Sequence, residues 1–206
     1  MPEMTTPAAL LLFTAVLSYL LGSVPFGVVM ARLFGLGDLR RIGSGNIGAT
    51  NVLRTGNRTA AALTLVLDAA KGAIAVLAAR AMLGEDAAQV AGFFAFAGHC
   101  YSVFMRLNGG KGVATFLGTL LALAWPVGLA ACAIWLVTAF ALRVSSLAAL
   151  VSAALAPVAA LLVGRLEAIA LALALGALIY LRHLPNIARL LKGTEPRIGA
   201  KRTPPA

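Results

Sequence analysis

Four consecutive residues of this chain, Gly109-Gly110-Lys111-Gly112, have the composition of an anion-binding loop. Glycines let an anion approach the main chain closely, and a helix that starts after Gly112 would offer unpaired N–H groups at the positive end of its dipole. Lys111 adds a full positive charge. The loop therefore predicts an anion pocket, with phosphate as the favoured anion.

Two observations limit this interpretation. The spacing fails the phosphate-loop pattern of nucleotide hydrolases, so nucleotide hydrolysis is unsupported. A plain interfacial turn, with a lysine that reaches the membrane surface, explains the loop equally well.

The apolar segment that follows, 113–124, spans only about 18 Å as a helix, too short for a bilayer core of about 30 Å. We therefore expect the loop to dip inward.

A second polar stretch, 43–54, is rich in glycine, amide and hydroxyl groups. If a helix begins after Gly48, then Thr50, Asn51 and Arg54 share one of its faces. A guanidinium fork beside hydroxyl and amide groups suits a phosphate or a polyol phosphate. The alternative is a solvated loop in which Arg54 is simply one of many basic residues on the same side of a membrane.

A third polar stretch begins at His183. Pro185 permits a new helix to start there, which would put Asn186 and Arg189 on one face. A further short connection contributes the two hydroxyls of Ser145-Ser146. Each signal is weak by itself, and together they predict several phosphate-compatible groups on one side of the membrane.

Charged groups also occur inside the apolar segments. Asp68 and Lys71 are three residues apart, and an acid within a membrane helix is costly unless it is paired and faces the bundle interior. We interpret this pair as structural support for the site, and the alternative is that it takes part directly in catalysis. His99 ends a Phe-rich segment, and we expect it to make an interhelical hydrogen bond.

The groups above must be positioned by helices that cross a bilayer. The chain has 206 residues, 61% hydrophobic and 12% charged, which is more apolar than a soluble domain requires. Breaks at glycine, proline and charge clusters leave seven apolar segments: 7–34, 59–83, 88–105, 113–124, 127–142, 147–163 and 167–182. We expect an all-α polytopic membrane protein with seven transmembrane helices and one domain over 1–206, of which 200–206 is a flexible tail.

The distribution of basic residues predicts the orientation. With seven crossings, two basic residues, Arg80 and Arg165, fall on one side, and the other fifteen fall on the opposite side. Those fifteen are Arg32, Arg40, Arg41, Arg54, Arg58, Lys71, Arg106, Lys111, Arg143, Arg182, Arg189, Lys192, Arg197, Lys201 and Arg202. The basic side is cytoplasmic by the positive-inside rule, so the N-terminus is outside and the C-terminus is in the cytoplasm. A six-helix arrangement would destroy this bias.

Three motifs that span nearly the whole chain carry a family resemblance. They are Ser44-Gly45-Asn46-x-Gly48-x-Thr50-Asn51-x-x-Arg54, then Gly98-His99 through Gly109-Gly110-Lys111-Gly112-x-Ala114-Thr115, and His183-x-x-Asn186-Ile187-x-Arg189-Leu190-x-x-Gly193-x-Glu195. Two shorter ones are Gly22-Ser23-Val24-Pro25-Phe26-Gly27 and Asp68-x-x-Lys71-Gly72. With these motifs the chain resembles the bacterial acyl-phosphate-dependent glycerol-3-phosphate acyltransferase family.

The resemblance implies an enzyme that moves a fatty acyl group from acyl phosphate to the 1-hydroxyl of glycerol 3-phosphate. The products are lysophosphatidic acid and inorganic phosphate, in the first acylation of phospholipid synthesis. It implies no metal, no coenzyme A and no other cofactor. The implied partners are the two substrates and the lipid bilayer, with the soluble acyl-phosphate-forming enzyme as a further candidate and no nucleic acid. The implied location is the bacterial inner membrane, with the active site facing the cytoplasm.

The resemblance also suggests residue roles. Glycerol 3-phosphate would be held by Ser44, Arg54, His183 and Asn186. Acyl phosphate would be held by Lys111 and the main chain of Gly109, Gly110 and Gly112, with help from Ser145 or Ser146, and Lys111 could bridge both phosphates. Further substrate contacts are expected from Asn46, Thr50, Asn51 and Glu195, and structural support from Asp68, Lys71 and His99.

Two questions stay open at this point. The general base is either His183 or a phosphate oxygen of the donor itself. The H-x-x-x-x-D motif of acyl-CoA-dependent enzymes is absent, because Phe104 stands five residues after His99 and Ala188 stands five after His183. The competing function is a small transporter or channel for an organic phosphate, which the lack of an inverted repeat disfavours.

Overall fold

The computed structural model describes residues 3–199, and every regular element in this part of the chain is helical. The α-helices are α1 (Ala8–Ser23), α2 (Phe26–Leu33), α3 (Ala49–Leu53), α4 (Arg58–Leu83), α5 (Glu85–Cys100), α6 (Val113–Leu123), α7 (Trp125–Leu142), α8 (Ser145–Leu162), α9 (Ile169–Arg182) and α10 (Leu184–Leu191). Short 3-10 turns occur at Leu39–Arg41, Val103–Met105 and Leu166–Ala168. The expected tail at 200–206, with Lys201 and Arg202, lies outside the described residues.

Each of the seven apolar segments expected from the sequence contains a helix, but the helices differ in length. Within residues 3–199, five are long and apolar enough to cross a membrane, and a sixth crossing results if α9 and α10, which bend by 62° at His183, count as one. Helix α6 has only 11 residues. The structure is thus an all-helical protein with five or six candidate spans by length and composition.

Two breaks between helices occur at prolines. The first apolar segment, 7–34, divides into α1 and α2 at Val24-Pro25, because proline lacks an N–H group and biases the preceding residue toward extended backbone. The division expected between the segments 113–124 and 127–142 is present. Helix α6 ends at Leu123, and Pro126 occupies the first turn of α7, where its missing N–H group costs nothing.

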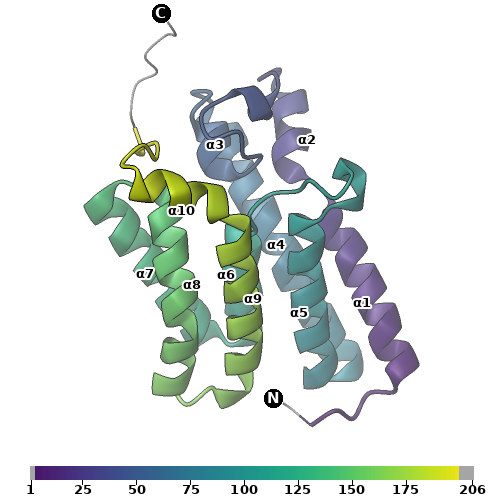
Figure 1. Ribbon diagram of the computed structural model, residues 1–206. Helices are drawn as coiled ribbons and strands as arrows, with labels where there is room; N and C mark the ends of the chain where they lie inside the picture. Colours follow the sequence, from purple (N-terminus) through teal and green to yellow (C-terminus); the bar gives the residue numbers. More distant parts are fainter. Residues whose placement is uncertain (1–2, 200–206) are drawn as a thin grey trace, which may run out of the picture.

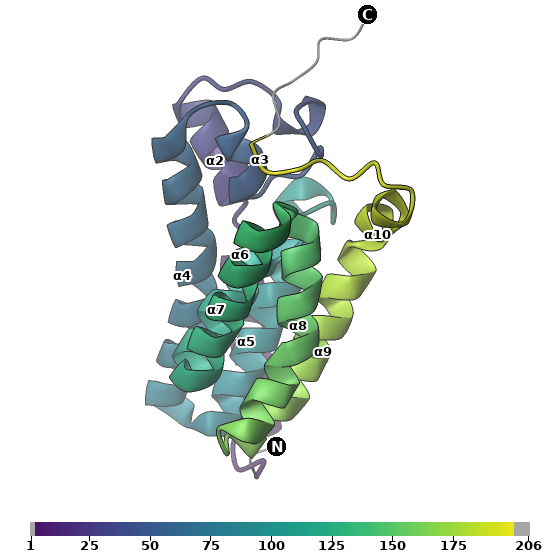
Figure 2. The same ribbon diagram turned by 90° about the vertical axis from the view of Figure 1, so that its left-hand side faces the viewer.

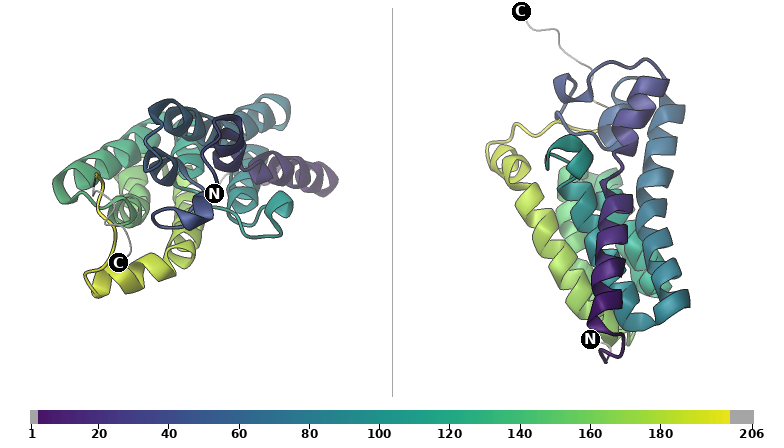
Figure 3. Two further views of the ribbon diagram at one scale, coloured as in Figure 1. Left: turned by 90° about the horizontal axis from the view of Figure 1, so that it is seen from above. Right: turned by 90° about the vertical axis from the view of Figure 1, so that its right-hand side faces the viewer.

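The long helices stand side by side, and the polar connections gather at one end (Figure 1). This end, called the loop end below, carries the segments 34–57, 101–112 and 183–199. The N-terminus lies at the opposite end, and α10 lies across the loop end rather than along the bundle (Figures 1 and 3). After α10 the chain crosses the loop end toward α3 (Figure 2). The three polar stretches singled out from the sequence therefore meet at one face.

Close helix contacts depend on small residues, as is usual between membrane helices. A Cβ atom at Gly118 of α6 would overlap the carbonyl of Ala69 in α4, and one at Gly22 of α1 would overlap the main chain of Ala95 in α5. The interior between α5, α6 and α9 is filled by Phe96, Phe116 and other fully buried side chains. These contacts fix α6 between α4 and α7 although α6 is short.

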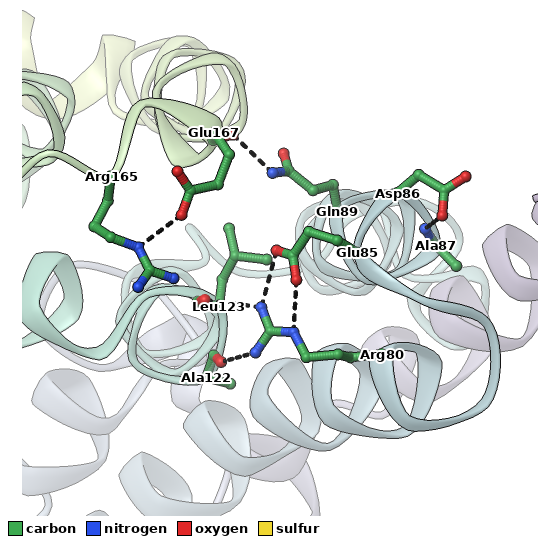
Figure 4. Close-up of polar contacts among 9 residues, drawn as sticks. All are labelled: Arg80, Glu85, Asp86, Ala87, Gln89, Ala122, Leu123, Arg165 and Glu167. Atoms are coloured by element: carbon green, nitrogen blue, oxygen red, sulfur yellow. Dashed lines mark hydrogen bonds and ion pairs between the residues drawn. The ribbon is translucent and has the colours of Figure 1, made fainter. Parts of the chain in front are cut away.

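A polar cluster holds the far end of α6, away from the loop end (Figure 4). Arg80 of α4 donates to the carbonyls of Ala122 (2.7 Å) and Leu123 (2.8 Å) and forms an ion pair with Glu85 (2.8 Å). A cation at the last carbonyls of a helix is favoured by its dipole and by the unpaired oxygens there.

Candidate active site

A cavity of about 580 Å³ opens at the loop end. Its polar part collects side chains from all three polar stretches and from the start of α8. These are Ser44, Asn46, Thr50, Asn51, Arg54, Arg58, Lys111, Ser145, Ser146, His183, Asn186 and Glu195. The structure thus brings together almost every residue proposed from the sequence, the exceptions being Gly109, Gly110 and Lys71, which do not line the cavity.

The cavity continues along the bundle as an apolar arm between α4, α6 and α7. Its walls are Ala61, Ala62, Leu65 and Ala69 of α4, Leu117, Gly118 and Leu121 of α6, and Cys132, Trp135 and Leu136 of α7. From Val113 to Leu121 the arm extends about 12 Å, at 1.5 Å of rise per residue. Sequence reasoning missed this arm, because its residues look like those of any membrane helix.

Asn51 organises the part of the cavity formed by residues 43–54. Its buried amide oxygen accepts hydrogen bonds from the Ser44 N–H group (3.1 Å) and from Arg54 (3.3 Å), and its amide nitrogen donates to the carbonyl of Leu39 (2.9 Å). Helix α3 begins at Ala49, directly after Gly48, so the condition under which Thr50 and Asn51 share a face with Arg54 is met. Gly43 has a positive φ of 53°, and a Cβ atom there would lie 2.6 Å from Asn51 and from Arg54, so this fold needs glycine.

The glycine loop differs from the expected arrangement in one respect. The N–H groups of Gly109 and Gly110 donate to the carbonyls of Cys100 (3.2 Å) and His99 (3.0 Å), so they are not free to hold an anion. The cause is the end of α5, whose last carbonyls have no partner within the helix and accept both donors. The free donors of the loop are the N–H groups of Lys111 and Gly112, which form no hydrogen bond within residues 3–199.

The Lys111 side chain is desolvated inside the cavity. Burial lowers the pKa of its ammonium to about 8, and the neighbouring charges of Arg189, Arg182 and Arg54 act in the same direction, whereas Glu195 opposes them. An anion bound beside Lys111 would reverse this shift, because an opposite charge favours the protonated form. The site without ligand is therefore a cationic cavity short of negative charge.

Glu195 ties the third polar stretch to α8. Its carboxylate accepts hydrogen bonds from Ser146 (2.7 Å), Asn186 and Arg189 (2.7 Å), and its side chain is 6% exposed. Burial acts to raise the pKa of Glu195, and these three donors outweigh it, so the pKa lies below its ordinary value. Because its oxygens are occupied and negatively charged, Glu195 orients the donors around it and does not itself hold a phosphate.

His183 has one ring nitrogen engaged. Its Nδ1 lies 2.8 Å from the carbonyl oxygen of Ile179, and because that oxygen only accepts, Nδ1 carries the proton. In the neutral ring Nε2 is then a proton acceptor. His183 is buried and lines the cavity.

The predicted Asp68–Lys71 pair is present, with 2.9 Å between Lys71 Nζ and Asp68 Oδ1. Lys71 also donates to the carbonyl of Val24 (2.8 Å), so the pair braces the break between α1 and α2. His99 Nδ1 lies 3.5 Å from the same Asp68 oxygen, but this nitrogen has no hydrogen-bond partner within residues 3–199, so the interhelical hydrogen bond expected of His99 is not formed there. Asp68 and His99 line the cavity, and Lys71 lies behind them.

Within residues 3–199 no group of three His, Cys, Asp or Glu side chains could hold a metal ion.

The fold and the cavity define an integral membrane protein in which a cavity lined by basic and polar groups is continuous with an apolar arm. Comparison with known proteins agrees with this class. The family model described as glycerol-3-phosphate acyltransferase matches residues 12–193. The chain is 70% identical over 198 residues to a glycerol-3-phosphate acyltransferase of Jannaschia sp. (strain CCS1), covering 96% of this chain and 98% of that one. It is 61% identical over 202 residues to one of Dinoroseobacter shibae, covering 98% and 100%.

Two solved structures share the fold. The crystal structure of PlsY, an integral membrane glycerol 3-phosphate acyltransferase, in its glycerol 3-phosphate form superposes with a TM-score of 0.86 at 41% identity, covering 92% of this chain and 96% of that one. Its lysophosphatidic acid form gives 0.83 at 38% identity, covering 92% and 95%. The chain therefore belongs to the glycerol-3-phosphate acyltransferase family.

Proposed function

We propose that this protein transfers a fatty acyl group from acyl phosphate to the 1-hydroxyl of glycerol 3-phosphate. The products are lysophosphatidic acid and inorganic phosphate. The observation that carries the proposal is the shape of one cavity, whose cationic part suits two phosphates and whose apolar arm suits a fatty chain. The glycerol 3-phosphate form of the solved relative supports the acceptor, and its lysophosphatidic acid form supports the product.

The residues around the cavity suggest how the substrates are held. Ser44, Arg54, His183 and Asn186 bind glycerol 3-phosphate, with further contacts from Asn46, Thr50 and Asn51. The acyl phosphate is bound by Lys111, by the free N–H group of Gly112 and by Ser145 or Ser146. The charges of Arg54 and of Glu195, from the other two polar stretches, both act on Lys111. Lys111 can therefore neutralise both phosphates and draw the acceptor hydroxyl toward the acyl carbonyl.

The reaction requires little beyond alignment and charge neutralisation. The acceptor oxygen forms a bond to the acyl carbon, the bond from that carbon to the phosphate oxygen breaks, and phosphate leaves with the electron pair. The acceptor proton goes either to His183 Nε2 or directly to an oxygen of the departing phosphate. Lys111 stabilises the negative charge that develops on the carbonyl and the leaving group.

The apolar arm provides the acyl site. Its walls are aliphatic and aromatic side chains of α4, α6 and α7, so burial of the chain there is favoured by the hydrophobic effect. The arm is about 12 Å long, less than half of a bilayer core of about 30 Å. The end of a long acyl chain therefore leaves the arm and lies among the bilayer lipids.

The orientation is part of the proposal. We place the loop end and the C-terminus in the cytoplasm of a bacterium, the N-terminus outside, and one domain with seven crossings in the inner membrane. The basic residues of the loop-end connections support this, since such residues favour the cytoplasmic side. The cytoplasmic face would also let a soluble acyl-phosphate-forming enzyme deliver its product directly. A cysteine introduced at Arg106 should react with an impermeant thiol reagent only in inside-out vesicles.

Purified protein in detergent, supplied with palmitoyl phosphate and glycerol 3-phosphate, tests the proposal. We expect lysophosphatidic acid and phosphate from this pair, and no product when glycerol replaces glycerol 3-phosphate. The competing function is a transporter for an organic phosphate. Absence of a lipid product, together with glycerol 3-phosphate flux in sealed vesicles, would favour the transporter.

A further inference from the structure

The glycine loop is held on two sides by hydrogen bonds. On one side α5 accepts the N–H groups of Gly109 and Gly110. On the other side Arg182, the last residue of α9, donates through Nη2 to the carbonyl of Gly109 (3.1 Å) and through Nε to the carbonyl of Gly110 (3.2 Å). The N–H and C=O groups of Gly109 and Gly110 are therefore all engaged, and the peptide group that joins the two residues is held at both its oxygen and its nitrogen.

Arg182 is itself held in place by aromatic stacking. Its guanidinium carbon lies 5.1 Å from the centre of the Tyr101 ring, within the range of a cation–π contact. The carbonyl of Tyr101 accepts a 2.6 Å hydrogen bond from the hydroxyl of Tyr19 in α1. Because the guanidinium is planar, stacking on the ring leaves its edge free to face two successive carbonyls.

The position of Arg182 connects the two sides of the cavity. The next residue after it is His183, and the next residue after Gly110 is Lys111, and both line the cavity. One side chain thus ties the loop to the helix end that carries His183. Position 110 requires glycine in this arrangement, because a Cβ atom there would overlap His99 Nε2.

The contact also directs the negative ends of two peptide dipoles away from the cavity. A carbonyl oxygen that turned toward a bound phosphate would repel it. We propose that Arg182 is a positioning residue for the acyl transfer proposed above, which fixes the glycine loop so that Lys111 and the free N–H groups face the donor phosphate. It acts through the loop and need not contact a substrate.

The test compares two matched substitutions, Arg182→Lys and Arg80→Lys. Arg80 also donates to two successive carbonyls, but at the far end of α6, where no proposed substrate group lies (Figure 4). Each substitution keeps the charge and removes the planar fork. We expect Arg182→Lys to raise KM for palmitoyl phosphate by about tenfold and Arg80→Lys to change it by less than about twofold, with kcat affected less than KM in both.

Three results would overturn the proposal: unchanged KM in Arg182→Lys, an equal rise in both variants, or a loss of kcat alone. Unchanged KM in Arg182→Lys with a rise in Arg182→Gln would mean that only the charge matters, which also overturns it. Inorganic phosphate, titrated against the thermal unfolding of each variant, gives a readout that needs no turnover. If the parent makes no lipid product but Arg182→Lys still weakens phosphate binding, acyl transfer fails while the positioning role stands.

Discussion

The hydroxyl of Ser146 donates a 2.7 Å hydrogen bond to the carboxylate of Glu195, 49 residues later in the chain. This bond joins the start of α8 to the segment that follows α10. The same carboxylate holds Asn186 and Arg189, so one acid arranges three donors, one from the start of α8 and two from α10.

Replacing Glu195 by glutamine should disorder this side of the cavity. The neutral amide cannot pair with Arg189 and cannot accept from three donors at once, and loss of a charged hydrogen-bond partner costs about 1–3 kcal/mol. We expect kcat/KM to fall by at least about tenfold. Glu167→Gln is the control, because Glu167 forms a similar pair with Arg165 (2.6 Å) at the opposite end. Equal losses in the two variants would contradict this role of Glu195.

The lowered pKa of Glu195 also predicts how the stability of the fold depends on pH. Because its folded pKa lies below the ordinary value of 4.5, Glu195 stabilises the fold above pH 4.5, and this stabilisation is lost as the pH falls through the folded pKa. Thermal unfolding in detergent should show that the difference between parent and Glu195→Gln shrinks as the pH is lowered from 6 to about 3. A constant difference would count against the pairing.

The lowered pKa of Lys111 predicts how the binding of palmitoyl phosphate depends on pH. Its pKa of about 8 means that the ammonium loses its proton above that pH, and the attraction for phosphate is lost with the charge. We expect KM for palmitoyl phosphate to rise toward about tenfold per pH unit above the pKa, as for any ligand that needs one proton on the protein. Lys111→Arg should move this limit upward, because guanidinium stays charged. An identical pH profile for both proteins would rule out Lys111 as its source.

Asn51 should affect the acceptor more than the donor. Its amide oxygen accepts hydrogen bonds from Arg54 and from the Ser44 N–H group. Asn51→Ala therefore removes the hydrogen bond that orients the Arg54 side chain. We expect KM for glycerol 3-phosphate to rise by about tenfold or more, with KM for palmitoyl phosphate changed by less than about threefold. Asn57→Ala is the control, since Asn57 caps α4 by accepting from Ala60 N–H (2.9 Å) and its loss should cost stability alone. Equal shifts in both KM values would contradict the assignment.

The apolar arm should control the length of acyl chain that fits. Leu121 lies near its far end, so Leu121→Trp would shorten the arm. We expect kcat/KM for palmitoyl phosphate, relative to octanoyl phosphate, to fall by at least about fivefold. Leu129→Trp is a suitable control, because Leu129 is 53% exposed on the outside of α7 and does not line the cavity. An unchanged ratio in Leu121→Trp would exclude the arm as the acyl site.

The sequence was sufficient where local chemistry dominates. The apolar segments predicted the helices, and the cost of a charge in a membrane helix predicted the Asp68–Lys71 pair. The gathering of the polar stretches at one end follows from the lengths of the segments between them.

What could not be predicted depends on contacts between distant segments. The N–H groups of Gly109 and Gly110 are taken by α5, and Arg182 reaches their carbonyls from α9, which no local pattern indicates. The apolar arm exists because α4 and α7 flank α6 without closing over it. Pro25 is plain in the sequence, but its presence did not predict that the first apolar segment divides there into two helices.

The central claim is that one cavity holds both phosphates and that Lys111 serves them together. It is tested most directly by measuring lysophosphatidic acid and inorganic phosphate in the same samples, from palmitoyl phosphate and glycerol 3-phosphate, for the parent and for Lys111→Gln. The account predicts equal amounts of the two products from the parent and a rate at least about a hundredfold lower from Lys111→Gln. Phosphate release without lipid product from the parent, or parental speed in Lys111→Gln, would contradict it.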